Sequence, residues 1–221
     1  MNTTACPPRR ALPRLVACLP VLATLVLTLA VPAEDRKPEG AKADPASTPL
    51  EVRITGEQRT FELEPWMIKD VENAIVAARE YEDPKMESTP TLDHTLEIVN
   101  TGKTPVEIWT EGDPFVLTLT LKGKGAVNLV PRRAVRKEFI SPKAVRLAPG
   151  ESFKMPLRSL QSGFRGEAHY AYWKEAGDYE ITATLRTGVS PAPEGAEAGE
   201  DGFGMVTLTS APFAVKVELT K

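Results

Sequence analysis

Apolar and polar residues alternate along most of the chain from residue 50 onwards, and this alternation predicts a series of β-strands. The clearest run is DYEITATLR at 178–186, where every second residue from Tyr179 to Leu185 is apolar and the residues between them are polar. One apolar and one polar face per strand is typical of antiparallel sheets that pack on a single side. Five more runs repeat the pattern, with apolar residues at Leu50, Val52 and Ile54; Leu92, Leu96 and Ile98; Phe115, Leu117, Leu119 and Leu121; Phe153, Met155 and Leu157; and Phe213, Val215, Val217 and Leu219.

Turn sequences that contain glycine and proline separate these runs. In LEIVNTGKTPVEIW, residues 96–109, Asn100 and Gly102 suit a positive φ and Pro105 precedes the next strand, which together predict a hairpin. Short strands at this spacing predict an all-β, two-sheet sandwich. Further turns are expected at GDP (112–114), GKG (123–125) and APG (148–150).

Residues 66–80 depart from the alternation. Their apolar residues recur at helical spacing, and Pro65 and Pro84 stand near the two ends of the segment. The spacing predicts a helix that packs over a sheet edge or caps one end of the sandwich. The alternative is that IVAAREY, residues 75–81, pairs as a strand. The apolar positions in question are Met67, Val71, Ala74, Ile75 and Ala78.

The first 33 residues have the composition of a secretory signal peptide. Arg9, Arg10 and Arg14 precede an uncharged run of 17 residues, LVACLPVLATLVLTLAV, which is followed by Pro-Ala33. We expect cleavage after Ala33, and an uncleaved membrane anchor is the alternative. Lipid attachment at Cys18 is disfavoured because most of the apolar run follows this residue instead of preceding it.

Residues 34–49, EDRKPEGAKADPASTP, are charged and proline-rich and predict a disordered leader, so the sandwich domain is expected at 50–221. Both cysteines, Cys6 and Cys18, lie in the signal, which leaves the mature chain without a thiol for catalysis, metal binding or a disulfide. The mature chain has 24 basic and 30 acidic residues and a net charge of −6, which gives no overall attraction to nucleic acid. With no further segment apolar enough to span a bilayer, we expect a soluble periplasmic or extracellular protein.

Four segments resemble bacterial secreted immunoglobulin-like domains: LEIVNTGKTPVEIW, VRLAPGESFKMPLRSL, AYWKEAGDYEITATLRT and APFAVKVEL. More narrowly, the stretch from GFRGEAHYAYW to MVTLTSAPF resembles uncharacterised exported bacterial proteins of planctomycete type, over about residues 90–219. The resemblance implies an immunoglobulin-like antiparallel β-sandwich and export, and it brings no catalytic residues. A looser likeness, at 149–157, is to small bacterial proteinase-inhibitor β-sandwiches.

Aromatic residues suggest one structural and one binding role. AGDY places a turn just before a strand, which predicts a tyrosine corner in which the Tyr179 hydroxyl bonds to the backbone a few residues upstream. In HYAYW, Tyr170, Tyr172 and Trp173 are spaced for a strand, and with Trp109 they suggest a platform for stacking sugar rings. The alternative is that Trp173 packs in the core.

The acidic segment PEGAEAGEDGFG, residues 193–204, is the most unusual local feature. Its carboxylates are oxygen ligands of the kind that Ca²⁺ prefers, but their spacing is not that of an EF-hand, and a solvated loop explains the charges equally well. We therefore assign no metal and no cofactor. The loop is still the best candidate for a functional surface because it is long and interrupts a series of strands. The carboxylates are Glu194, Glu197, Glu200 and Asp201.

Neither histidine suggests catalysis. His94 and His169 lack partners at the spacing of metal ligands, and no nucleophile motif accompanies them. The basic cluster PRRAVRKEF, residues 131–139, either faces an anionic partner or protects an edge strand from aggregation.

The sequence therefore predicts an exported, non-catalytic β-sandwich module with one short helical insertion, which binds a protein or a cell-envelope component and not nucleic acid. The alternatives are a secreted proteinase inhibitor and a carbohydrate-binding module. Contact is expected from the 188–204 loop and from the HYAYW segment. The candidate binding residues are Tyr170, Tyr172, Trp173, Glu200, Asp201 and Phe203.

Overall fold

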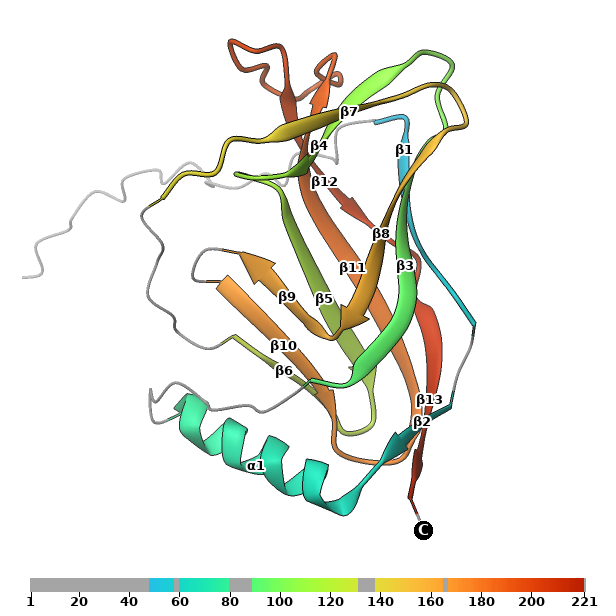
Figure 1. Ribbon diagram of the computed structural model, residues 1–221, viewed down its shortest axis with the longest axis vertical. Helices are drawn as coiled ribbons and strands as arrows, with labels where there is room; N and C mark the ends of the chain where they lie inside the picture. Colours follow the sequence, from blue (N-terminus) through green and yellow to red (C-terminus); the bar gives the residue numbers. More distant parts are fainter. Residues whose placement is uncertain (1–47, 58–59, 80–88, 131–137, 165–166, 221) are drawn as a thin grey trace, which may run out of the picture. The chain divides into compact units, whose positions relative to one another are not determined.

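The computed structural model describes residues 48–57, 60–79, 89–130, 138–164 and 167–220 (Figure 1). The predicted signal peptide and the leader up to residue 47 lie outside the described residues. In chain order the elements are β1 (Leu50–Thr55), β2 (Thr60–Leu63), α1 (Pro65–Arg79), β3 (Thr91–Asn100), β4 (Val106–Glu111), β5 (Val116–Gly123), β6 (Ala126–Leu129), β7 (Lys143–Leu147), β8 (Ser152–Ser159), β9 (Gln161–Phe164), β10 (Glu167–Trp173), β11 (Gly177–Ser190), β12 (Gly204–Thr209) and β13 (Phe213–Leu219).

The largest sheet is built around β11. Along one edge β11 pairs first with β13 and then with β12, and along the other edge first with β5 and then with β4. β7 extends the sheet beyond β4, and β2 extends it beyond β13. Only the β2–β13 pair is parallel among the strand pairs of the described residues.

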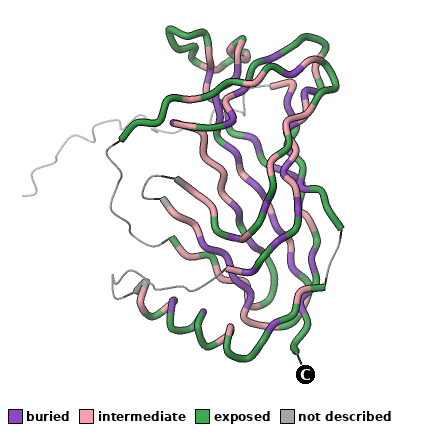
Figure 2. The backbone as a smooth tube through the Cα atoms, in the orientation of Figure 1, coloured by how far each residue is buried: buried purple, intermediate pink, exposed green. Residues whose placement is uncertain are grey.

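A second sheet, β1-β3-β8, shares one hydrophobic core with the β11 sheet. Leu96 and Ile98 of β3 are fully buried, as are Ile181 and Leu185 of β11, and all four belong to the same cluster. Buried positions alternate with exposed or partly buried ones along β1, β3 and most of β11, as the sequence predicted (Figure 2). The all-β, immunoglobulin-like antiparallel sandwich with one helix is therefore confirmed.

The predicted hairpin at 96–109 is wrong. β3 pairs with β1 and β8, whereas β4 pairs with β11 and β7, so the turn between β3 and β4 carries the chain from one sheet to the other. The β7–β8 connection crosses between the same two sheets. The alternation in each strand specifies only which side chains point inward. A hairpin and a crossover between sheets both keep those side chains inward, so the sequence pattern does not distinguish them.

The side chain of Asn100 holds the β3–β4 crossover in place. It is fully buried, and its Nδ2 group donates to the carbonyl oxygens of Thr104 (2.9 Å) and Leu147 (3.0 Å). Its Oδ1 atom accepts the Gly102 N–H at 2.9 Å. Since Leu147 ends β7, this one amide joins the two crossovers that connect the sheets.

Backbone hydrogen bonds around Asn100 complete the junction. Its N–H donates to Glu151 O, its carbonyl accepts the Gly150 N–H, and the next N–H, of Thr101, donates to Pro49 O. Pro49, assigned to the disordered leader, is thus part of the folded structure. Gly102 does not have the positive φ that the sequence suggested, and its role is spatial because a Cβ there would lie 2.6 Å from the Cβ of Pro49.

A third sheet, β6-β10-β9, carries the helix. α1 follows the predicted bounds closely, with Pro65 at its first position; residues 75–79 are helical, so the alternative of a strand that begins at residue 75 is wrong. Val71 and Ile75 of α1 pack with Tyr170 and Tyr172 of β10 in a separate cluster. Within the described residues no helix has the length and hydropathy that a membrane span requires.

The predicted tyrosine corner is present. Tyr179 is buried, and its hydroxyl donates to the carbonyl of Glu175 at 2.7 Å. Gly123 lies opposite Tyr179 in β5 and makes room for the ring, since a Cβ there would be 2.5 Å from the Tyr179 Cδ1. Burial raises the pKa of the Tyr179 hydroxyl, which therefore stays a protonated donor at neutral pH.

We expect Asn100→Ala to lower the free energy of unfolding by about 2–4 kcal/mol, because buried partners lose their hydrogen bonds. Asn100→Asp should destabilise at least as much, since a carboxylate cannot donate and would face two carbonyl oxygens. Denaturant unfolding measures both values. Lys103→Ala, on the exposed part of the same turn, is the control and should change stability by less than about 0.5 kcal/mol. An Asp variant more stable than the Ala variant would contradict this role of the amide.

Tyr179→Phe removes the corner hydrogen bond and leaves the ring in place. We expect it to lower the free energy of unfolding by about 1–2 kcal/mol, because the Glu175 carbonyl loses its hydroxyl donor. Thermal and denaturant unfolding measure the change. An unchanged melting temperature would show that this hydrogen bond does not stabilise the corner.

Candidate functional site

The HYAYW platform predicted from the sequence is wrong, because all three aromatic side chains are buried. Trp173 points into the main core, with its ring 5.0 Å from Phe61 and 6.0 Å from Tyr179. Tyr170 and Tyr172 point the other way, where α1 covers them. Burial raises the pKa of Tyr172 well above its ordinary value, as expected for a phenol in an apolar cluster. A strand covered on both faces offers no surface for a sugar ring.

The predicted contact loop at 188–204 is shorter in the structure, because β11 continues to Ser190 and β12 begins at Gly204. The remaining residues, 191–203, project beyond the sheet as an exposed loop (Figures 1 and 2). Its base is closely packed, since a Cβ on Gly204 would lie 2.8 Å from the Cβ of Ala192. The loop therefore leaves the sheet in a defined direction.

Hydrogen bonds within the loop fix the part that carries the acidic residues. The Gly202 N–H donates to Gly199 O at 3.0 Å, and the Gly199 N–H donates to Phe203 O at 2.8 Å. Asp201 Oδ1 accepts the Phe203 N–H at 3.1 Å, an Asx turn that orients its carboxylate. The Asp201 carboxylate is therefore held against the backbone of Phe203.

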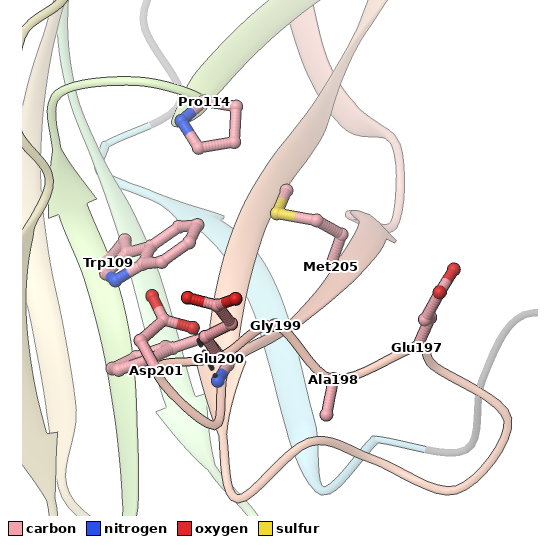
Figure 3. A pocket seen from close by; sticks show the side chains of 9 residues that line it. Trp109, Pro114, Glu197, Ala198, Gly199, Glu200, Asp201 and Met205 are labelled. Atoms are coloured by element: carbon pink, nitrogen blue, oxygen red, sulfur yellow. Dashed lines mark hydrogen bonds between the residues drawn. The ribbon is translucent and has the colours of Figure 1, made fainter.

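Residues of the loop and of the outer face of the β11 sheet together line an open pocket of about 760 Å³. The Phe203 ring stacks on the indole of Trp109 from β4, with ring centroids 4.9 Å apart and planes inclined by 19°. In Figure 3 the Glu200 and Asp201 carboxylates extend toward the Trp109 ring, whereas the Glu197 carboxylate is directed away from it. The pocket is lined by Trp109, Pro114, Glu197, Ala198, Gly199, Glu200, Asp201, Phe203 and Met205.

Gly188 of β11 leaves the space that the Trp109 indole occupies. A Cβ at this position would overlap the indole, coming within 2.6 Å of its Cδ2 and Cζ3 atoms. Thr187 precedes Gly188 in β11. Its hydroxyl donates a hydrogen bond to Trp109 O at 2.8 Å and so holds β4 beside β11 at this point. Trp109 is half-buried as a result, with one part of its ring on the sheet and another part in the pocket.

The other candidate groups lie elsewhere. His94 is buried against Phe61 and Phe213, and its Nε2 atom is buried without a hydrogen-bond partner. His169 lies on β10 opposite Ser162 of β9. No group of three or more His, Cys, Asp or Glu side chains is placed to hold a metal ion in the described part of the chain. Most of the basic cluster, residues 131–137, lies outside the described residues.

A smaller depression, of about 220 Å³, lies beside the start of β4. Glu107 and Arg146 line it and are opposite each other in the β4–β7 ladder, so its two charges balance. It has no aromatic wall among the described residues. The pocket at Trp109 is the stronger candidate because it combines stacked aromatic rings with charge of one sign.

Three of the six predicted binding residues, Glu200, Asp201 and Phe203, thus meet in one pocket. The sequence pattern indicates Trp109 only as an addition to the HYAYW platform and gives no signal for Met205. Gly188 is the signal that could have found the site, since a glycine inside an otherwise regular strand marks a close approach by another group.

The fold and the tyrosine corner define the class of this protein as an immunoglobulin-like antiparallel β-sandwich module. No family model matches the chain, and no curated protein matches it. Among solved structures the chain is similar to the ASH / PapD-like domain of human CEP192 (PapD-like domain 7), with 13% sequence identity and a TM-score of 0.25 over 83% of this chain and 94% of that chain.

Gly188→Ala should displace the Trp109 ring and break its stack on Phe203, because the added methyl group occupies the space of the indole. We expect the free energy of unfolding to fall by about 1–3 kcal/mol, the usual effect of overpacking. A double-mutant cycle with Trp109→Ala tests the cause, since Gly188→Ala should have little effect once the indole is absent. An equal loss of stability in both backgrounds would place the strain elsewhere.

Proposed function

We propose that this protein is an exported, non-catalytic β-sandwich module that binds a protein or another cell-envelope component through the pocket at Trp109. The observation that carries the proposal is the stacked pair of Trp109 and Phe203 on the outer face of the sheet, beside the oriented carboxylate of Asp201. It follows that the loop at 191–203 and the outer face of β4 form one binding surface.

The position of Trp109 on its strand supports a binding role. Glu107 and Glu111 lie on the same outward face of β4 and are exposed, as expected for a sheet face turned to solvent. Trp109 breaks this polar face, although the core lies on the opposite side of the strand. A partly buried indole in a stacked pair on a sheet face supports a contact surface, because aromatic residues contribute much of the binding energy at such surfaces.

The chemistry of the pocket also favours binding over catalysis. Its titratable groups, among the described residues that line it, are the carboxylates of Glu197, Glu200 and Asp201. All three are exposed to solvent, whereas catalytic acids and bases usually occupy water-excluded sites. Met205, Pro114 and the aromatic pair supply contact area without reactive groups.

Export is supported by the N-terminal sequence. Three arginines precede an uncharged apolar run that ends near Ala33, and a charged, proline-rich segment follows it. The resemblance of residues 90–219 to exported planctomycete-type immunoglobulin-like proteins points the same way. A periplasmic or extracellular location gives the module access to envelope components.

We expect the full chain, produced in an exporting bacterial host, to be recovered with Glu34 as its first residue, and to retain a discrete component from native envelope extract. Trp109→Ala should abolish retention of that component because it removes the wall of the pocket. N-terminal sequencing establishes the processing, and mass spectrometry with reconstitution from the purified component establishes the binding.

Trp66→Ala is the matched control, since Trp66 is 53% exposed on α1 and lies outside the pocket. This variant should retain the component as the unaltered protein does. Retention that is lost with Trp66→Ala and kept with Trp109→Ala would overturn the pocket as the binding surface. Recovery of the chain with Met1 still present would overturn export by signal cleavage.

A further inference from the structure

His94 of β3 is a titratable side chain in the apolar interior. It is 4% exposed, and its Nδ1 atom lies 3.0 Å from the carbonyl oxygen of Asp93. A carbonyl can only accept a hydrogen bond, so the single N–H of the neutral ring is at Nδ1, and Nε2 carries a lone pair. The Nε2 atom is buried without a hydrogen-bond partner. The neutral imidazole therefore has its one donor satisfied at this position.

The ring of His94 joins the β1-β3-β8 sheet to the β2–β13 edge of the β11 sheet. Its centroid lies 4.7 Å from that of Phe213 on β13 and 6.1 Å from that of Phe61 on β2. In the ladder it is opposite Leu157 of β8. A Cβ on Gly56, in the turn after β1, would lie 2.7 Å from Nδ1. Apolar side chains and backbone therefore surround the imidazole.

The described charged side chains on these segments point away from the ring. In β1, β2, β3, β8 and β13 they occupy the outward positions, which alternate with the inward position of His94, and Glu57 lies in the exposed turn after β1. Among the described residues the buried carboxylate is that of Asp113, which accepts the Ile140 N–H far along the chain. The charged residues of the segments around the ring are Glu51, Arg53, Glu57, Glu62, Asp93, Glu97, Lys154, Arg158, Lys216 and Glu218.

A second proton on the imidazole would bind at Nε2 and turn this atom into a donor. In the closed structure the new N–H meets no acceptor, because Nε2 is buried without a partner. The charged ring also loses its hydration there, and the nearby phenyl rings offer only a cation–π attraction, which is weaker than that hydration. Protonation therefore favours a conformation in which the ring of His94 reaches water.

β2 is a short edge strand beside His94. It has four residues, stands at the end of its sheet and pairs with β13 from Thr60 to Leu63. β3, in contrast, is paired along both edges, with β1 and β8. β2 leads directly into α1, which begins at Pro65 (Figure 1). Short elements with few ladder bonds open at a lower free energy than the strands in the middle of a sheet.

We propose that protonation of His94 releases β2, together with α1, from the edge of the β11 sheet. Because α1 covers Tyr170 and Tyr172 on β10, its release also exposes these two rings. The fold thus contains a device that changes conformation when the surroundings become acidic. This inference goes beyond the proposed function and involves no residue that lines the Trp109 pocket.

The dependence on pH has one direction. The closed form holds a neutral imidazole, whereas in the open form the ring takes up a proton as a free imidazole does, at about pH 6.5. The closed form is therefore fully stable above that pH. Below it the open population increases, by at most about tenfold per pH unit, because one proton is bound.

The test is hydrogen exchange of the full chain, as recovered from the exporting host, at about pH 7.5 and about pH 5.5, on either side of the imidazole range. Protection factors remove the intrinsic effect of pH on exchange and can be compared between elements. We expect the amides of β2 and α1 to lose protection at least about fivefold at the lower pH. The amides of β11 that pair with β5 should keep their protection and are the internal reference.

His94→Phe and His94→Gln both remove the titrating group, and each should keep β2 and α1 protected at the lower pH. His169→Gln, on β10 opposite Ser162, is the matched control and should lose protection as the unaltered protein does. If neither His94 variant folds, NMR of the unaltered chain replaces them. The ring signals of His94 should then change over the same pH range as the protection of β2.

Three results would overturn this inference: unchanged protection of β2 and α1 in acid, an equal loss in the His94→Phe variant, or ring signals of His94 that change over a different pH range. A loss in β11 as large as that in β2 would do so too, since it would mean that the whole sandwich unfolds. Retention of an envelope component tests the Trp109 pocket alone. The proposed function and this inference can therefore fail separately.

Discussion

The buried amide of Asn100 is the interaction on which the two-sheet arrangement depends. A sandwich needs connections that leave one sheet and enter the other, and here two of them, β3–β4 and β7–β8, meet at this residue. Each crossover turns backbone groups away from the ladders, and buried backbone groups must find other partners. Asparagine supplies two donors and an acceptor on a short side chain, and all of them are used at Asn100. An apolar residue would fill the space and leave the Leu147 carbonyl without this donor.

The position of the candidate site follows from that junction. β4 begins at Val106, shortly after the crossover, and its pairing with β11 places Ile108 opposite Val189. This register brings the indole of Trp109 over Gly188, which lacks the methyl group that would exclude it. The loop that follows β11 then returns to β12 across the same region. A fixed crossover, one strand register and one missing side chain therefore place Trp109 in the pocket, whose other lining residues come mostly from the loop.

The sequence predicted which side of each strand is buried better than it predicted which strands pair with one another. Period-2 alternation identified the buried positions of β3 and β11 because burial on one side imposes it directly. The helix and the tyrosine corner were also found, since each has a local signal: helical spacing from Met67 to Ala78, and a turn just before Tyr179. The hairpin failed because sheet membership is decided by long-range contacts, such as the one from Asn100 to Leu147. The HYAYW platform failed for the same reason, because nothing local indicates that α1 covers the outer side of β10.

The acidic loop shows how local and distant information combine at a site. Its composition drew attention to Glu200, Asp201 and Phe203, but composition alone suggested calcium or simple solvation. The structure changes this interpretation by adding Trp109, a residue far away in the sequence, as the stacking partner of Phe203. The acidic loop therefore shares its surface with an aromatic pair, and composition could not show this because Trp109 and Phe203 are far apart in the sequence. The pocket therefore depends on both the loop and strand β4, and neither segment would form it alone.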